Sequence, residues 1–190
     1  MSAVVKGSHV LLQGYRPGGL AQMGYSPEQL ASQRPGIVVI SLSAYGTRGP
    51  WAQRRGFDSL VQTATGSNDA EAAAAGSDTP KPMPVQILDF ATGFLMAYAA
   101  SAALLRQQRE GGSWHVQLSL AQTAHWLRSL GTVANGFTAQ TPARDSFIEA
   151  SASGYGELRA VRHSAQLSRT PAGWARPSMP PGSHAPVWPV

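Results

Sequence analysis

The sequence predicts an α/β protein: a partial, open, Rossmann-like parallel sheet with flanking helices, followed by an irregular tail rich in proline and arginine. Short apolar runs alternate with segments of helical character over residues 9–130. One run, IVVISLS at 37–43, is apolar at nearly every position, as in a parallel strand that is covered on both faces. Six prolines fall within the last twenty residues, which disfavours regular structure there.

The first predicted unit is strand, helix, strand. HVLLQ at 9–13 is a short apolar run that ends at a glycine. Ser26-Pro27-Glu28-Gln29 has a capping serine, a proline at the first helical position and a glutamine that completes a capping box. This helix should stop before Pro35-Gly36, and the strand at 37–43 follows. This order predicts a βαβ unit.

The remaining elements are predicted from periodicity and from glycine and proline positions. They are a helix at 57–65 with Asp58 as candidate cap, a linker at 67–84, a short strand at 85–88, a helix at 91–109, a strand at 114–120 and a helix at 121–130. Periodicity fades after residue 131. We therefore expect an α/β domain over 1–131, and over 132–190 a C-terminal tail that wraps a surface or is poorly ordered.

Composition restricts the function classes. The net charge is +5 and thirteen of the fifteen cations are arginine, yet the only adjacent pair is Arg54-Arg55. A basic nucleic-acid-binding domain is therefore only a distant alternative. The absence of cysteine excludes disulfides and thiolate metal sites and fits a reducing cytoplasm. The apolar stretch at 90–105 is short for a membrane span and is predicted to be a buried helix.

Asp89 is the one acid in the otherwise almost wholly apolar stretch PVQILDFATGFLMAY at 84–98. The predicted elements place it between a strand and a helix, the position where ligands usually bind in open α/β sheets. Aspartate there can be a simple N-cap. It can also be an ionised nucleophile, stabilised by the helix N-terminus. The two roles do not exclude each other, and the sequence leaves both open.

Four segments in order carry a resemblance to a known family. They are GYRPGGLAQMGYSPEQL, PGIVVISLSAYGTRGPWAQRRGFDSLVQTATG, VQILDFATGFLMAYAASAALLRQQREGG and WHVQLSLAQTAHW. Together they resemble the class III CoA-transferases, also called the carnitine and bile-acid CoA-transferase family. The resemblance extends over residues 9–130 and is loose in the tail.

The resemblance implies a covalent mechanism at Asp89. The matching aspartate attacks the thioester of an acyl-CoA, the anhydride formed is opened by the CoA thiolate, and an acceptor acid takes over the CoA. The apolar surroundings of Asp89 would then keep water from the anhydride. Coenzyme A and acyl-CoA are implied as substrates, with no permanently bound cofactor and no metal.

The resemblance also implies CoA contacts. The segment that matches Gly14 to Gly18 lines the CoA site, so Tyr15 would offer a ring to adenine and Arg16 a guanidinium to a phosphate. Arg55 matches a basic position near the phosphates, and Arg48 is a further candidate from the same loop. Gln22 stands where some relatives carry arginine, so one contact is expected to be missing.

Two departures from the family narrow the prediction. Family racemases use a histidine at the position of Phe57, and phenylalanine cannot accept a proton, which disfavours racemase chemistry.

Matches to an N-terminal βαβ segment and to a small domain with a glycine-rich loop are not found. The family is dimeric, so we expect a homo-oligomer or a partner chain that supplies the missing segment. The alternative is a truncated, non-catalytic CoA-binding or interaction module.

Overall fold

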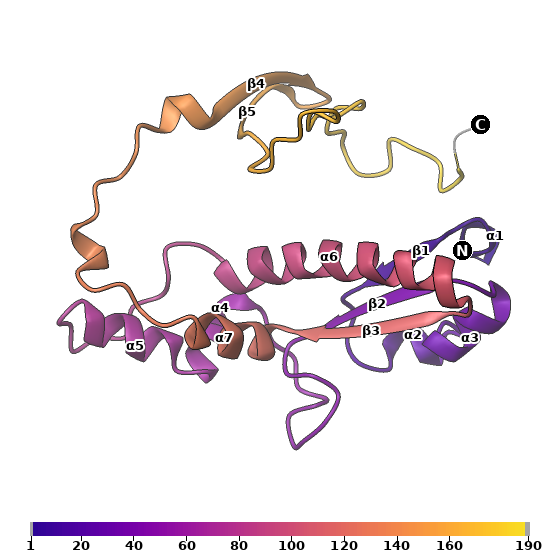
Figure 1. Cartoon of the computed structure of the whole chain (residues 1–190), viewed down its shortest axis with the longest axis horizontal. Helices are drawn as coiled ribbons and strands as arrows, with labels where there is room; N and C mark the ends of the chain where they lie inside the picture. The colour runs from indigo at the N-terminus through magenta and orange to yellow at the C-terminus, as the bar shows by residue number, and fades with distance from the viewer. Residues whose placement is uncertain (1, 189–190) are drawn as a thin grey trace. The chain divides into compact units, whose positions relative to one another are not determined.

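A three-stranded parallel sheet organises the first part of the chain (Figure 1). Its strands are β1 (Val10–Gln13), β2 (Val38–Ser43) and β3 (Trp114–Ser119), in the order β1-β2-β3. Val10 of β1 and Trp114 of β3 both pair with Val38 of the central strand. The computed structural model describes residues 2–188.

Seven helices accompany the sheet in the described residues. They are α1 (Ser2–Lys6), α2 (Gly19–Gln22), α3 (Pro27–Gln33), α4 (Asp58–Ala64), α5 (Ser67–Ala74), α6 (Ile87–Glu110) and α7 (Leu120–Ser129). The predicted βαβ unit is confirmed as β1-α3-β2, with the short α2 in the connection. The predicted capping box is present, because Ser26 Oγ accepts the N–H of Gln29 and Gln29 Oε1 accepts the N–H of Ser26.

The central strand is covered on both faces, as its apolar sequence predicts. Val39 packs with Val5 of α1 and Leu30 of α3 on one face. Val38 and Ile40 pack with α6 residues on the other face, where Figure 1 shows α6 lying along the sheet. The alternation of side chains along β2 therefore builds an α/β/α arrangement.

A third apolar cluster lies at the carboxyl end of the sheet. It joins Val61 of α4 and Leu88 of α6 to Leu120 and Ala124 of α7, and all four are buried. This cluster determines where α6 begins, because Leu88 is in its second helical position and is fully buried. The predicted strand at 85–88 is therefore wrong: VQIL runs into the first turn of α6.

The predicted linker at 67–84 is partly helical. Residues Ser67–Ala74 form α5, in which Ser67 and Ala72 are buried. Alanine has the highest helix propensity, and the burial of Ser67 and Ala72 anchors this short Ala-rich helix. The proline-rich remainder up to residue 84 carries no helix or strand.

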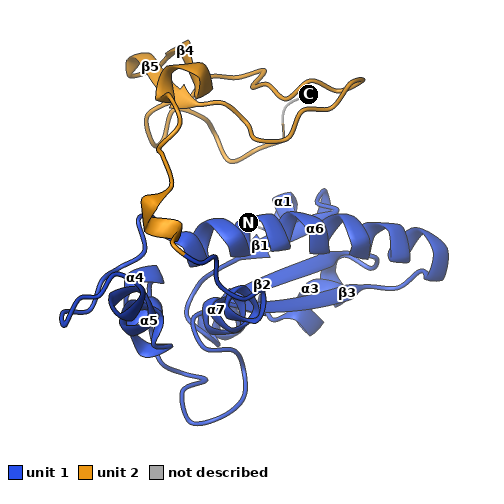
Figure 2. Cartoon of the chain, turned by 60° about the vertical axis from the view of Figure 1, so that its left-hand side comes forward, with its two compact units in different colours: residues 1–134 blue, residues 135–190 orange. Residues whose placement is uncertain are grey.

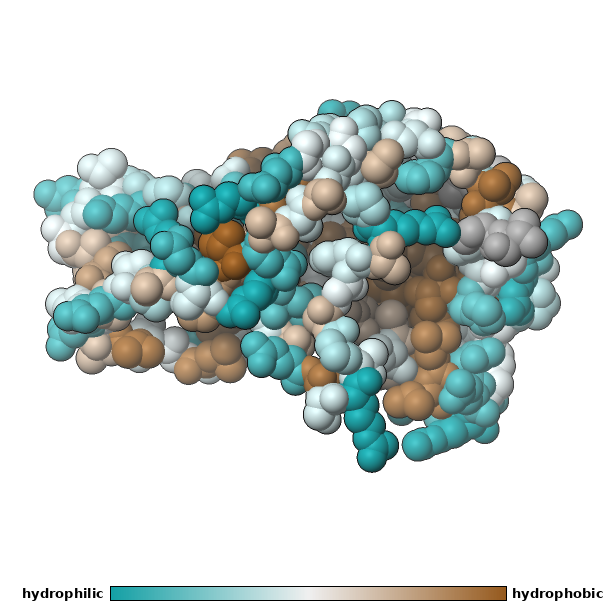
Figure 3. All heavy atoms as spheres, turned by 90° about the horizontal axis from the view of Figure 1, so that it is seen from above, coloured by the Kyte–Doolittle hydropathy of each residue, from teal (hydrophilic) through white to brown (hydrophobic). Residues whose placement is uncertain are grey.

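Helix α6 is not the buried helix that the sequence predicts. By length and composition alone it could cross a membrane, yet one side of it packs on the sheet and the other side is exposed. Phe90, Phe94, Tyr98 and Leu105 are 55–74% exposed and follow a helical spacing. Figure 3 shows hydrophobic side chains at the molecular surface among hydrophilic ones. We call Phe90, Phe94, Tyr98 and Leu105 the α6 stripe.

The α6 stripe leads to a prediction about association. Exposed apolar side chains on one helix face, together with sheet edges at β1 and β3, favour contacts between copies of the chain. We expect the isolated chain to self-associate at high micromolar concentration in size-exclusion chromatography with light scattering. A variant with Phe94→Gln and Tyr98→Gln should associate less. A monodisperse wild-type monomer with cooperative unfolding would contradict this expectation.

The second part of the chain is a separate compact unit, residues 135–190, distinct from residues 1–134 (Figure 2). It has two 3-10 turns, η1 (Gly136–Thr138) and η2 (Arg144–Phe147), and an antiparallel hairpin of β4 (Ile148–Ser153) and β5 (Gly156–Val161). The prediction of an irregular tail is wrong for this hairpin. None of residues 135–188 is buried, so the unit lacks a core of its own.

Candidate functional site

Three arginines meet in a pocket at the carboxyl ends of β1 and β2. Arg16 comes from the loop after β1, while Arg54 and Arg55 come from the long loop after β2. The pocket has a volume of about 420 Å³ and no acidic residue lines it. The other lining residues are Gly14, Tyr15, Pro17, Ser43, Ala44, Gly56 and Phe57. We call this the triple-arginine pocket.

The composition of the triple-arginine pocket suits a phosphorylated ligand with an aromatic group. Within residues 2–188 the side chains of Arg16 and Arg55 make no hydrogen bond or ion pair, so both guanidinium groups are free to bind an anion. Tyr15 is 68% exposed and Phe57 is 81% exposed. Exposed rings beside free guanidinium groups can stack on a base while the cations hold phosphates.

Close packing holds the loop that carries Arg54 and Arg55. The Arg54 guanidinium lies 4.6 Å from the Trp51 ring centroid, and that ring meets the Tyr45 ring edge-on at 5.0 Å. A Cβ on Gly56 would come within 2.7 Å of the Ala44 Cβ. Glycine is therefore required at position 56 for the loop to return to the end of β2, with Phe57 at the pocket.

Asp89 lies in the first turn of α6, at the third helical position. Gln86 is the N-cap residue of α6, and its side chain makes no capping hydrogen bond. The predicted alternative that Asp89 is an N-cap is therefore wrong. Asp89 is also exposed, in contrast to the water-poor setting that its apolar neighbours predict. Its carboxylate still lies where a helix N-terminus favours negative charge.

The cap of α6 comes from another helix. Asp58 Oδ2 accepts the backbone N–H of Asp89 at 2.9 Å, and Asp58 Oδ1 accepts a bond from Gln62 Nε2. Asp58 is 1% exposed and stands in the first position of α4, whose N-cap is Phe57. The prediction that Asp58 caps its own helix is thus wrong. Its carboxylate instead fixes the start of α6 against the start of α4.

This pair of carboxyl groups changes the chemistry of Asp89. Displacement of water by the surrounding protein raises the pKa of the Asp89 carboxyl, and the charge of the nearby Asp58 raises that pKa further. Asp89 therefore takes up a proton at a higher pH than an ordinary aspartate. Its carboxylate form is correspondingly more basic and a better nucleophile once deprotonated.

The structure brings together three of the predicted CoA contacts and separates the fourth. Tyr15, Arg16 and Arg55 line the triple-arginine pocket, whereas Arg48 lines a different pocket beside β3. Sequence reasoning missed Arg54 as a lining residue, although it is adjacent to Arg55. It also missed the contact of Asp58 with Asp89, which are 31 positions apart.

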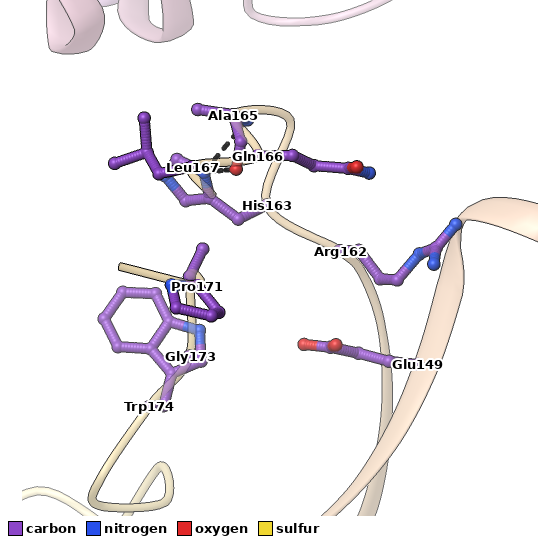
Figure 4. A pocket seen from close by; sticks show the side chains of 10 residues that line it. Glu149, Arg162, His163, Ala165, Gln166, Leu167, Pro171, Gly173 and Trp174 are labelled. Carbon is purple, nitrogen blue, oxygen red and sulfur yellow. Dashed lines mark hydrogen bonds between the residues drawn. The ribbon is translucent and has the colours of Figure 1, made fainter. Parts of the chain in front are cut away.

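A further pocket belongs to the second unit (Figure 4). It has a volume of about 590 Å³, and Glu149, Arg162, His163 and Trp174 are among its lining residues. His163 Nδ1 accepts the N–H of Ala165 at 3.1 Å, so one of the two ring nitrogens is already engaged. No residue predicted as functional lies there.

Comparison with known proteins identifies the family. Residues 1–147 match the sequence profile described as CoA-transferase family III. The chain belongs to this family. A probable fatty acyl-CoA transferase of Mycobacterium tuberculosis, Rv3272, is 33% identical over 63% of this family III chain and 30% of its own length. A succinate–glutarate CoA-transferase of Agrobacterium fabrum is 28% identical over 62% of the chain and 29% of its own length.

Solved structures agree with this assignment. The crystal structure of Rv3272 superimposes with a TM-score of 0.62 at 32% identity, over 68% of the family III chain and 36% of Rv3272. A CaiB/BaiF family protein of Brucella suis has the same fold, with a TM-score of 0.59 at 22% identity over 82% of the chain and 44% of its own length. The chain spans about a third of the length of the curated relatives named above.

Proposed function

We propose that this chain carries the CoA-binding pocket and the nucleophilic aspartate of an enzyme that moves CoA between an acyl-CoA and a carboxylic acid. One observation carries the proposal. Tyr15 and Arg16 line one pocket together with Arg55 and Phe57, which lie about forty positions later in the sequence. The next residue, Asp58, accepts the N–H of Asp89 at 2.9 Å. The proposed CoA site and the proposed nucleophile are thus joined through adjacent residues.

Arginine and aromatic groups would divide the recognition of CoA between them. Guanidinium groups bind phosphate oxygens through paired N–H donors, and the free groups of Arg16 and Arg55, with Arg54 stacked on Trp51 beside them, suit a ligand with several phosphates. The exposed ring of Tyr15 offers a face to adenine. In this arrangement the thioester end extends past Phe57 toward the start of α6.

The proposed reaction uses only Asp89 and the substrates. A carboxylate oxygen of Asp89 attacks the thioester carbon, the C–S bond breaks, and CoA leaves as a thiolate, so that the acyl group and Asp89 form a mixed anhydride. The thiolate then attacks the aspartyl carbon, which releases the first acid as a carboxylate and leaves an aspartyl-CoA thioester. An acceptor carboxylate repeats these two steps in reverse and regenerates Asp89.

A second candidate function follows from the exposure of Asp89. Water that reaches a mixed anhydride hydrolyses it, so a transferase needs its nucleophile to be covered during the reaction. Asp89 is exposed in this chain. That observation favours the alternative of a CoA-binding module without transfer activity. A homo-oligomer or a partner chain that covers Asp89 would reconcile the exposure with catalysis.

We propose the cytoplasm as the location of the protein under either candidate function.

Mass spectrometry after incubation with an acyl-CoA separates the two candidates. Transferase chemistry should give a CoA adduct on the peptide that contains Asp89, and the Asp89→Asn variant should give none. CoA binding without an adduct would leave only the binding module. Absence of CoA binding to the wild-type chain, measured by calorimetry, would contradict both candidates. Arg55→Gln should bind CoA more weakly than the wild type.

Phe57 gives a prediction about racemase activity. Proton exchange next to a thioester requires a base, and Phe57, exposed at the triple-arginine pocket, provides none. We expect solvent deuterium to enter the 2-position of a branched acyl-CoA no faster than in a protein-free control. Rapid exchange that is lost in Asp89→Asn would contradict this expectation and would implicate Asp89 in the proton transfer.

A further inference from the structure

The residue that the triple-arginine pocket leaves out, Arg48, lines a second pocket at the carboxyl ends of β2 and β3. This pocket also has a volume of about 420 Å³. Its other lining residues are Tyr45, Gly46, Thr47, Leu95, Gln117, Leu118, Ser119, Gln122, Thr123 and Trp126. We call it the Trp126 pocket.

The Trp126 pocket has one charge and a large apolar part. Arg48 is its single charged lining residue, and the structure gives Arg48 no hydrogen bond or ion pair within residues 2–188. Leu95, Leu118 and the 42%-exposed Trp126 supply apolar surface. A ligand that matches this lining has a single negative charge at one end and an apolar body.

A side-chain contact joins the Trp126 pocket to α6 at a residue one helical turn after Asp89. Thr123 lines the pocket, and its hydroxyl is 2.7 Å from the hydroxyl of Thr92 on α6. Both threonines are buried, so this contact fixes α6 against α7. Asp89 precedes Thr92 by three positions, and residues with that spacing are neighbours on a helix surface.

The loop after β2 serves both pockets. Its first part, Tyr45 to Arg48, lines the Trp126 pocket, and its last part, Arg54 to Phe57, lines the triple-arginine pocket. The ring contact between Tyr45 and Trp51 at 5.0 Å ties the two parts together. The start of α6 is thus linked through Asp58 to one pocket and through Thr92 to the other.

We propose that the Trp126 pocket binds the acid substrate, and that this substrate is a monocarboxylic acid with an aliphatic chain. Arg48 would hold the carboxylate through paired N–H donors, and Leu95, Leu118 and Trp126 would contact the chain. The inference rests on the proposed function, because it assigns to that reaction the site of its second substrate. A dicarboxylate fits less well, because the pocket has no second cation.

Binding of hexanoate to the full chain, measured by isothermal titration calorimetry, tests the proposal. Hexanoate should bind saturably, and the neutral hexanamide and the doubly charged succinate should bind more weakly. Arg48→Gln should weaken hexanoate binding at least about tenfold, the usual effect of losing a hydrogen bond to a charged group. Arg48→Lys should keep part of the affinity. Arg109→Gln is the matched control, because Arg109 is exposed on α6 and lines neither pocket.

The outcomes separate this inference from the proposed function. Exposed Arg48 has no internal partner, so Arg48→Gln should keep the wild-type melting temperature and any lost affinity is local. Equal losses in Arg48→Gln and Arg109→Gln, or equal binding of hexanoate and hexanamide, would overturn the assignment of the pocket. If the Asp89–CoA adduct forms but hexanoate binding does not depend on Arg48, the assignment of the Trp126 pocket is wrong and the proposed reaction stands. If hexanoate binding depends on Arg48 but no Asp89–CoA adduct forms, the proposed reaction is wrong and the assignment of the pocket stands.

Discussion

Replacement of Asp89 by asparagine is expected to reduce CoA transfer to background and to change the free energy of unfolding by less than about 1 kcal/mol. Asparagine has nearly the same size but is a neutral amide, so it cannot form the covalent intermediate. The side chain is exposed at the third position of α6 and caps no helix. Its charge is stabilised by the helix N-terminus and repelled by Asp58, and these two opposing effects are its contributions to stability.

Asp89→Ala gives the same expectation and makes the test sharper. If Asp89 were a helix cap, alanine would destabilise the protein by about 1 kcal/mol or more, and asparagine would not. The observed geometry predicts that both variants lose transfer and both keep their stability. Asp69→Asn, an exposed acid in the first turn of α5, is the control and should retain activity. Transfer by Asp89→Asn at the wild-type rate would remove Asp89 from the mechanism.

Elements that are specified by a few neighbouring residues could be predicted from the sequence. The capping box of Ser26 and Gln29 specifies the start of α3 within four residues, and the apolar run at 37–43 specifies a strand that is covered on both faces. Both signals arise from neighbouring residues, and neither depends on what packs against them. The glycines at 111 and 112 likewise mark the end of α6, where both have positive φ.

Elements that depend on distant partners could not be predicted in the same way. A four-residue apolar run such as VQIL is compatible with strand or helix, and the burial of Leu88 against Val61 and Leu120 decides for helix. The hairpin of β4 and β5 has weak alternation and no buried residue, so its sequence carries little signal.

The candidate site shows the same division. The resemblance pointed to Asp89 and to the CoA contacts one by one, and the structure brings Tyr15, Arg16 and Arg55 into one pocket. Arg48 lies apart from them because of the path of the loop at 44–57. The close approach of Gly56 to Ala44 determines this path. The role of Asp58 is set by a contact between two helices, which no local pattern encodes.

Asp58→Ala is expected to destabilise residues 1–134 by about 3 kcal/mol, because it leaves buried donors without an acceptor. Asp58 is 1% exposed and accepts from both Gln62 Nε2 and the N–H of Asp89. Gln62 in turn donates to the carbonyl of Val85 at 3.2 Å and accepts the N–H of Met83 at 3.1 Å. Loss of the carboxylate therefore loosens the segment before α6 as well as its first turn.

Urea denaturation followed by circular dichroism measures this effect, with Asp69→Ala as the control on an exposed acid. The control should change the free energy of unfolding by less than about 0.5 kcal/mol. Asp58→Asn should fall between the two, because its amide keeps one acceptor and turns an NH₂ group toward the other donor. Adduct formation on Asp89 should also decrease in Asp58→Ala at temperatures where the variant is folded, since the backbone of the nucleophile is no longer fixed. A loss of stability no larger than that of Asp69→Ala would show that α6 is held by the apolar cluster around Leu88 and not by this carboxylate.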